Sequence, residues 1–188
     1  MADTADVIAI AEKAHEGQMY GEFPYLSHPL HLANALAIFG KRACHVAILH
    51  DVIEDSDTTA QDLAGAGVDP SVVEAVETLT RGDQPYEEYI LNLVQAQESG
   101  SRQGDTPTLL TEDELRGAGV APGTKLSLPV LVKLADNLHN TQKHRLIGKM
   151  PEGKENLARR YNRAYEVLSS SIPDEVVELV KRCVDGEF

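Results

Sequence analysis

The sequence predicts an all-α fold, and two observations carry that prediction. Apolar residues recur at helical spacing in successive segments, and no segment alternates with period two over a useful length. Capping residues, glycines and prolines separate these segments where helices would begin and end. The 188 residues suit a single domain, and a hydrophobic content of 42% is enough for a core. With 5% aromatic residues and no Trp, that core should consist of Ala, Leu, Val and Ile.

Capping residues mark the helix boundaries in the first part of the chain. Asp3 or Thr4 can accept hydrogen bonds from the free N–H groups at the start of a first helix. Pro29 has the backbone angle of a helix start and is expected to begin a second helix, which Gly40 ends. A third helix, which carries His50, is predicted to follow.

The rest of the chain has equally clear helix starts. The Asp-Thr-Thr run at 57–59 is predicted to cap a short helix, and Asp69 with Pro70 begins the next one. Residues 99–126 hold many Gly, Thr, Pro and Asp and are interpreted as a lid, an insertion or an oligomer contact, with a capping box at 111–114. The remaining helices are predicted around 86–93, around Asp136, at about 152–170 and at about 174–184.

The composition argues against several classes of protein. A formal net charge of −13 argues against nucleic-acid binding, which should show a basic stripe. It still allows a small anionic substrate, because a metal ion and a few Lys or Arg side chains can reverse the field locally. The start of the chain predicts no signal peptide and no membrane span. Two cysteines without a C-x-x-C motif fit a reducing compartment, so a cytoplasmic location is expected, and the oligomeric state stays open.

The stretch 48–55, Ile-Leu-His-Asp-Val-Ile-Glu-Asp, sets four polar side chains in an apolar run. On a helix, His50 and Glu54 would share one face, and so would Asp51 and Asp55, because each pair is four residues apart. Three carboxylates and an imidazole this close together would repel one another without a cation. The stretch therefore predicts a metal site, with carboxylates left over to handle a proton.

A His-Asp pair supplies only two ligands, so others must come from elsewhere. His28 precedes Pro29, which restrains it away from the α region, and is expected at the mouth of a helix. Asp136 ends an apolar run, with Lys133 and Asn140 on its own helix face. The predicted metal ligands are His28, His50, Asp51 and Asp136.

The order His…His-Asp…Asp resembles the HD superfamily of metal-dependent phosphohydrolases, whose members are helical bundles. Blocks at 14–18, 24–29, 50–55, 80–81 and 133–141 narrow the likeness. Together they resemble the hydrolase domain of the RelA/SpoT alarmone family, and its small standalone members most closely. The likeness covers roughly residues 5–170 of one domain spanning 1–188, with a gap near 100–126.

One divalent metal is expected. No histidine occurs between Asp51 and Asp136, whereas di-iron members of the superfamily use additional histidines there. Two imidazoles and two carboxylates suit Mn, Fe, Co, Ni or Zn, and the resemblance implies Mn²⁺.

The resemblance and the residue types together suggest roles around the metal. Glu54 and Asp55 are not needed as ligands and are expected to orient a water molecule and take its proton. The resemblance implies that Asn140 hydrogen-bonds the nucleoside. Phosphate charge could be neutralised by three cations that are equally plausible as solvated surface residues, namely Arg81, Lys133 and Lys143.

The loop at 18–25 departs from the family pattern. The family has an Arg there that stacks on guanine, whereas this shorter loop has Tyr20. A tyrosine can stack on a base but brings no cation, so a guanine preference does not carry over. The histidines outside the predicted ligand set, among them His31 and His139, are interpreted as structural or surface residues, although His31 could share the face of His28 and His139 borders the predicted site.

These observations predict a metal-dependent phosphohydrolase that removes pyrophosphate from the 3′ position of a nucleotide alarmone such as (p)ppGpp. The expected partner is a small nucleotide. Two alternatives stay open: a nucleotidase or phosphatase acting on another small nucleotide, and a non-hydrolytic nucleotide sensor. The presence of both Glu54 and Asp55 argues against the sensor.

Overall fold

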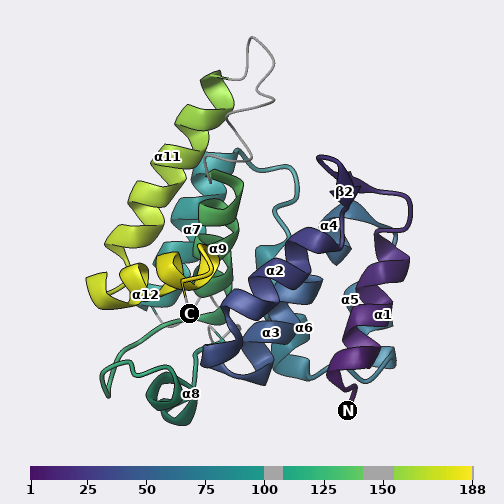
Figure 1. Cartoon of the computed structure of the whole chain (residues 1–188), viewed down its shortest axis with the longest axis horizontal. Helices are drawn as coiled ribbons and strands as arrows, with labels where there is room; N and C mark the ends of the chain where they lie inside the picture. The colour runs from purple at the N-terminus through teal and green to yellow at the C-terminus, as the bar shows by residue number, and fades with distance from the viewer. Residues whose placement is uncertain (100–107, 142–154, 188) are drawn as a thin grey trace.

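The computed structural model describes residues 1–99, 108–141 and 155–187. This part of the chain is mostly helical, which confirms the predicted all-α class (Figure 1). In chain order the elements are α1 (Thr4–Ala14), β1 (Met19–Tyr20), β2 (Phe23–Pro24), α2 (Ser27–Ala35), the 3₁₀ helix η1 (Ala37–Phe39), α3 (Lys41–Leu49), α4 (Val52–Asp55), α5 (Ala60–Gly65), α6 (Pro70–Leu79), α7 (Tyr86–Ser99), α8 (Glu112–Gly117), α9 (Leu128–Thr141), α11 (Glu155–Ser170) and α12 (Asp174–Val184).

Side-chain caps fix several helix starts where the sequence predicts them. Asp3 forms a capping box at the start of α1. Thr59 and Thr111 do the same for α5 and α8. Asp69 caps α6, and Pro70 lies in the first turn. Each cap supplies an acceptor to an N–H group that the helix itself leaves unpaired, an arrangement worth about 1 kcal/mol.

Helix α2 begins at Ser27, two residues before the predicted start at Pro29. A proline is tolerated within the first turn, because the N–H group that it lacks would have no partner inside the helix. His28 therefore lies inside the first turn and is buried.

The predicted helix through His50 is interrupted. Helix α3 ends at Leu49 and α4 begins at Val52. Asp51 between them has φ −106° and ψ −1°, which turns the chain away from a regular helix. His50 and Asp51 therefore form a junction between two helices, and a side-chain face cannot be extrapolated across it.

A short hairpin precedes α2. Strands β1 and β2 pair antiparallel, with Tyr20 opposite Phe23, and Gly21 in the turn has φ +65°. A positive φ of this kind favours glycine. Two-residue strands are too short to produce an alternating pattern, which is why the sequence did not predict them.

Helix α9 lies at the centre of the bundle. It packs against α2, α3, α6, α7, α11 and α12, and every residue from Leu128 to Val132 is buried. Helix α3 packs against α1, α2, α6 and α9. Figure 1 shows α9 between the α7–α11 pair and α2–α3. Because apolar side chains cover α9 on all sides, burial in the core holds it in place.

Residues 108–126, the described part of the predicted lid, pack at the end of the bundle remote from His28. Helix α8 lies against η1, beyond the C-terminal end of α2, whereas His28 is at the N-terminal end of α2 (Figure 1). Arg42 donates from Nε to Glu114 Oε1 at 2.8 Å, and Leu115 and Leu126 are buried. These contacts favour a packing role for this part, and residues 100–107 lie outside the described chain.

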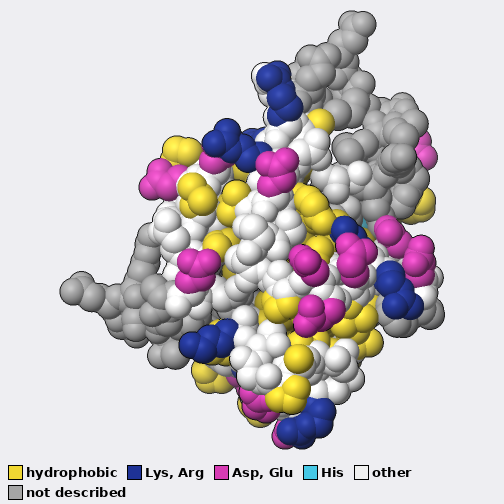
Figure 2. Space-filling view, turned by 90° about the vertical axis from the view of Figure 1, so that its left-hand side faces the viewer, with side chains coloured by type: hydrophobic (Ala, Val, Ile, Leu, Met, Phe, Trp, Pro, Cys, Tyr) yellow, Lys and Arg dark blue, Asp and Glu magenta, His cyan; other side chains and the backbone are white. Residues whose placement is uncertain are grey.

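Figure 2 shows the face of the molecule on the left side of Figure 1. Acidic, basic and apolar side chains of the described residues are interspersed across it. Within the described ranges, no helix combines the length and the apolar composition that a bilayer span requires.

Candidate metal centre

Three parts of the chain bring the four predicted metal ligands together. His28 comes from α2, His50 and Asp51 from the α3–α4 junction, and Asp136 from the central helix α9. Ligand atoms of His28, His50 and Asp51 lie within 4.8 Å of one another. His28 Nε2 is 3.1 Å from Asp136 Oδ1, and His50 Nε2 is 4.0 Å from the same oxygen. Two imidazoles and two carboxylates therefore converge on one place.

The His50 ring is oriented as a metal ligand would be. Its Nδ1 lies 2.9 Å from the carbonyl oxygen of Ala47, and because that oxygen can only accept, Nδ1 donates. Its buried Nε2 is not counted in any hydrogen bond among the described residues, although it lies 2.8 Å from Asp51 Oδ2, close enough for an ion pair when His50 is protonated. A cation between these two atoms would satisfy both, so the residues present fit a divalent metal.

Asp136 is surrounded by donors. Lys133 Nζ lies 2.8 Å from its Oδ2, and Asn140 Nδ2 donates to its Oδ1 at 2.6 Å. Burial would raise the pKa of Asp136, but Lys133 and then His28 hold it well below the ordinary value. Burial likewise opposes the charge on Lys133, yet Asp136 above all raises its pKa. Lys133 thus faces the predicted metal ligand Asp136 and stabilises it in its charged form.

Two tyrosines of the hairpin region enter the site. Tyr25 donates its hydroxyl proton to Asp51 Oδ2. Tyr20 donates to Asn140 Oδ1 at 2.6 Å, and its ring stacks on His28 with the centroids 4.6 Å apart. Tyr20 and Asn140, both predicted as substrate-binding, are therefore bonded to each other beside the cluster.

Glu54, Asp55 and Arg81 lie at the edge of the cluster. The backbone N–H of Arg81 donates to Glu54 Oε2 at 3.2 Å, and Arg81 Nε is 3.7 Å from Glu54 Oε1. Burial, followed by the charges of Asp51 and Glu54, raises the pKa of the Asp55 carboxyl. The last predicted substrate contact, Lys143, lies outside the described residues.

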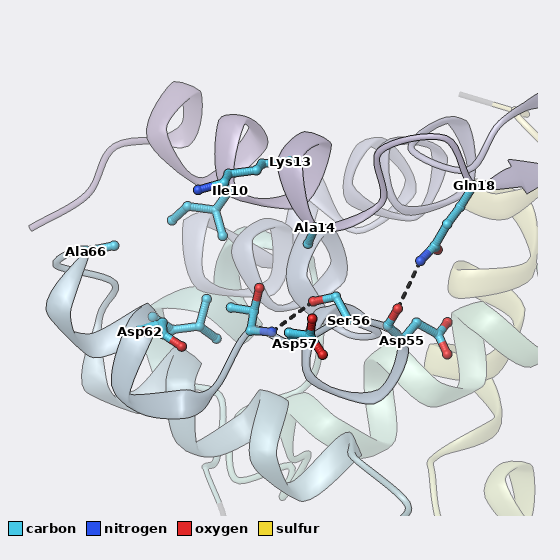
Figure 3. A pocket seen from close by; sticks show the side chains of 11 residues that line it. Ile10, Lys13, Ala14, Gln18, Asp55, Ser56, Asp57, Asp62 and Ala66 are labelled. Atoms are coloured by element: carbon cyan, nitrogen blue, oxygen red, sulfur yellow. Dashed lines mark hydrogen bonds between the residues drawn. The ribbon is translucent and has the colours of Figure 1, made fainter.

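A cavity of about 730 Å³ opens next to Asp55, between α1 and α5. Figure 3 shows Gln18 and Asp55 at one end of it and Asp62 and Ala66 toward the other, with Gln18 Nε2 donating to the backbone oxygen of Asp55 at 2.9 Å. None of the four predicted metal ligands lines this cavity. Asp55 lines the cavity, and the four predicted metal ligands lie outside it.

Three residues beside the predicted ligands received no functional role from the sequence. Tyr25 bonds to Asp51, and His139 and His31 stack behind His28. Helical spacing could have indicated two of them. His31 is three residues after His28 and His139 is three residues after Asp136, so each shares a helix face with a predicted ligand. Tyr25 had no such signal, since its approach to Asp51 depends on the turn before α2.

No family model matches the chain. Curated bacterial proteins do align with it. A guanosine-3′,5′-bis(diphosphate) 3′-pyrophosphohydrolase of Vibrio cholerae is 42% identical over 79 residues, which are 40% of this chain and 11% of that protein. The bifunctional (p)ppGpp synthase/hydrolase SpoT of Escherichia coli is 30% identical over 165 residues, 85% of this chain and 20% of that protein. The guanosine-3′,5′-bis(diphosphate) 3′-pyrophosphohydrolase of Haemophilus influenzae is 33% identical over 138 residues, which are 70% of this chain and 17% of that protein.

The alignments cover 40–85% of this chain but only 11–20% of the length of these relatives. Together with the helical bundle, which is consistent with an HD domain, they confirm the predicted resemblance. The chain is homologous to the (p)ppGpp 3′-pyrophosphohydrolase region of RelA/SpoT proteins.

Proposed function

We propose that this protein is a metal-dependent phosphohydrolase that removes pyrophosphate from the 3′ position of a nucleotide alarmone such as (p)ppGpp. One observation carries the proposal: the two imidazoles and two carboxylates that converge from α2, the α3–α4 junction and α9. The homology to (p)ppGpp pyrophosphohydrolases supports the same reaction class.

His28, His50, Asp51 and Asp136 would hold the metal, with Mn²⁺ as the first candidate. A bound divalent ion would supply Lewis acidity toward a phosphoryl oxygen and toward water. The carboxylates of Asp51 and Asp136 and the ammonium of Lys133 leave a net negative charge, which a divalent cation reverses. The loaded site would therefore attract a phosphate group despite the acidic character of the whole chain.

Asp55 and Glu54 would manage the proton of the attacking water. The raised pKa of Asp55 makes it a stronger base than an ordinary aspartate, which suits a group that accepts a proton near neutral pH. Glu54 is held by Arg81, so it would orient water and share this task. Lys133 would keep Asp136 in its charged form and would not contact the phosphate itself. Arg81 and Lys143 stay proposed phosphate contacts.

Asn140, the nucleoside contact that the resemblance implies, is bonded to protein groups in the structure. Asn140 donates an amide N–H to Asp136, and its carbonyl oxygen accepts a hydrogen bond from the Tyr20 hydroxyl. A nucleoside that reaches the Asn140 carbonyl would share it with the Tyr20 hydroxyl, so we propose that Tyr20 influences base preference through this bond. Stacking of the Tyr20 ring on a base would compete with its stacking on His28.

Substrate turnover tests the proposal. Purified protein with Mn²⁺ would be assayed on ppGpp, ppApp, NADPH and nucleoside monophosphates, with and without inorganic pyrophosphatase. Phosphate that appears from ppGpp only when pyrophosphatase is present supports the proposed reaction. Direct phosphate release from another nucleotide supports the nucleotidase alternative. Binding of ppGpp without any product supports the sensor.

A further inference from the structure

Three histidine rings are stacked behind the metal centre. The His28 and His139 rings have centroids 4.9 Å apart, and those of His139 and His31 are 4.2 Å apart. The Nδ1 atoms of His28 and His139 are 2.7 Å apart, and His31 Nε2 is 2.8 Å from the carbonyl oxygen of Val184. The stack therefore connects a predicted metal ligand on α2 to the C-terminal helix α12.

The contact between His28 and His139 restricts where their protons lie. One of the two Nδ1 atoms must carry hydrogen and the other must not, and a neutral imidazole has only one N–H. A nitrogen that binds a metal must keep its lone pair free. His28 directs Nε2 toward Asp136 Oδ1, so a bound metal would leave the His28 proton on Nδ1. His139 must then accept that proton at its own Nδ1.

We propose that His139 is a positioning residue for the metal site. It accepts the Nδ1–H of His28 and thereby fixes the tautomer and the ring orientation that present Nε2 to the metal. His31 holds His139 by stacking, while its own N–H donates to Val184. The inference rests on the proposed metal site. Hydrogen-bond partners of this kind typically change metal affinity 10–100-fold.

Two substitutions of His139 separate hydrogen bonding from packing. Asparagine places an acceptor oxygen near the position of Nδ1, whereas leucine has similar bulk and no acceptor. Both remove the ring, so both lose the stacking with His31. We expect His139→Leu to lower the affinity of the full chain for Zn²⁺ by about 10–100-fold and His139→Asn to stay close to wild type. The affinity would be measured by competition with a chromogenic chelator, using Zn²⁺ alone.

A control on the same helix accounts for a general loss of packing. Leu131 is fully buried in α9 and makes none of the site contacts described above, so Leu131→Ala should lower the melting temperature while Zn²⁺ affinity is retained. Equal losses of affinity in the Leu and Asn variants of His139, or no loss in either, would overturn the proposal.

Protonation can also be read directly in the wild-type protein, which avoids any folding defect of a variant. Long-range ¹H–¹⁵N spectra with bound Zn²⁺ should show His28 protonated at Nδ1 and His139 unprotonated at Nδ1. The opposite assignment would overturn the role of His139. If the wild-type chain binds no Zn²⁺, the proposed metal site itself is wrong. If it binds Zn²⁺ tightly and the His139 variants bind equally well, only the role of His139 is wrong.

Discussion

Burial and neighbouring charges shift pKa values in opposite directions at the cluster of His28, His50, Asp51 and Asp136. Burial opposes the charge on His50, but Asp51 and then Asp136 raise its pKa to about 9. Burial lowers the pKa of His28, although Asp136 opposes this shift. The metal-free protein therefore holds a protonated His50 between two carboxylates, and a metal ion has to displace that proton.

The stability of the metal-free protein should fall as the pH rises through about 9. The folded-state pKa of His50 lies above its ordinary value of 6.5, so its proton stabilises the fold fully below pH 6.5 and this contribution is lost above pH 9. Thermal unfolding in EDTA across this window measures the effect. His50→Gln is the control, because it has no proton to lose, and a wild-type decline no steeper than that of His50→Gln would contradict the assignment.

Asp55→Asn should keep the metal and lose turnover. The amide preserves the shape of the side chain but cannot accept a proton, and general-base catalysis is typically worth about 10²–10⁴-fold. We expect a loss of that size in kcat, with metal content and nucleotide affinity close to wild type. Glu54→Gln should lose less, because Arg81 already holds Glu54. A variant of Asp55 that loses its metal would show that Asp55 is a ligand.

At the scale of elements, the α3–α4 junction and the start of α2 decide where the ligands point. His50 and Asp51 reach the cluster because regular helix stops at Leu49. His28 reaches it because α2 begins before the proline that follows this histidine. Both features are local departures from the helices that the sequence predicts.

Helix α8 should contribute to stability and not to metal binding. Arg42 is half-buried, bonds to Glu114 through two nitrogens and donates to the carbonyl oxygen of Leu109. Arg42→Met should cost about 1–3 kcal/mol in the free energy of unfolding by urea, because charge-assisted hydrogen bonds are lost while the apolar stem remains. Zn²⁺ affinity should not change, since α8 packs against η1 beyond the C-terminal end of α2, whereas His28 lies at the N-terminal end of α2.

Arg116→Met is the matched control for this prediction. Its ion pair with Asp113 lies on the same short helix but is mostly exposed, with 73% of the Arg116 side chain accessible. Exposed pairs are screened by water, so we expect a change within about 0.5 kcal/mol. A loss of Zn²⁺ affinity in Arg42→Met would instead support the lid interpretation of residues 108–126.

At the scale of the whole molecule, a metal would join parts of the chain that are far apart in sequence. His28, His50 and Asp136 come from three different helices or their ends. Zn²⁺ should therefore raise the melting temperature, because binding only to the folded state adds about 2.7 kcal/mol at 100 times the dissociation constant. Calorimetry with Zn²⁺ and with EDTA measures the shift. His28→Ala, His50→Ala and Asp136→Ala should each abolish it, and an unchanged shift in all three would remove the proposed site.

The sequence by itself determined the helical class and most of the helix starts. Asp3, Thr59, Asp69 and Thr111 act through hydrogen bonds to residues two or three positions away, so their effects can be inferred from local sequence. The ligand types were also predictable, because histidine and aspartate inside apolar runs need a partner that burial alone does not provide. Convergence of the ligand set was an inference from order and resemblance, and the structure brings the four side chains together.

Only the tertiary structure decided what surrounds the ligands. Tyr25 meets Asp51, Tyr20 meets Asn140, and His139 meets His28 across separations of 26, 120 and 111 residues. Contacts of this kind depend on how helices cross and where a turn places a side chain, and neither leaves a periodic signal in the sequence. The same holds for the break between α3 and α4. Residue spacing predicted which residues could bind a metal. Packing around α9 determined which other side chains contact those predicted ligands, balance their charge and orient them.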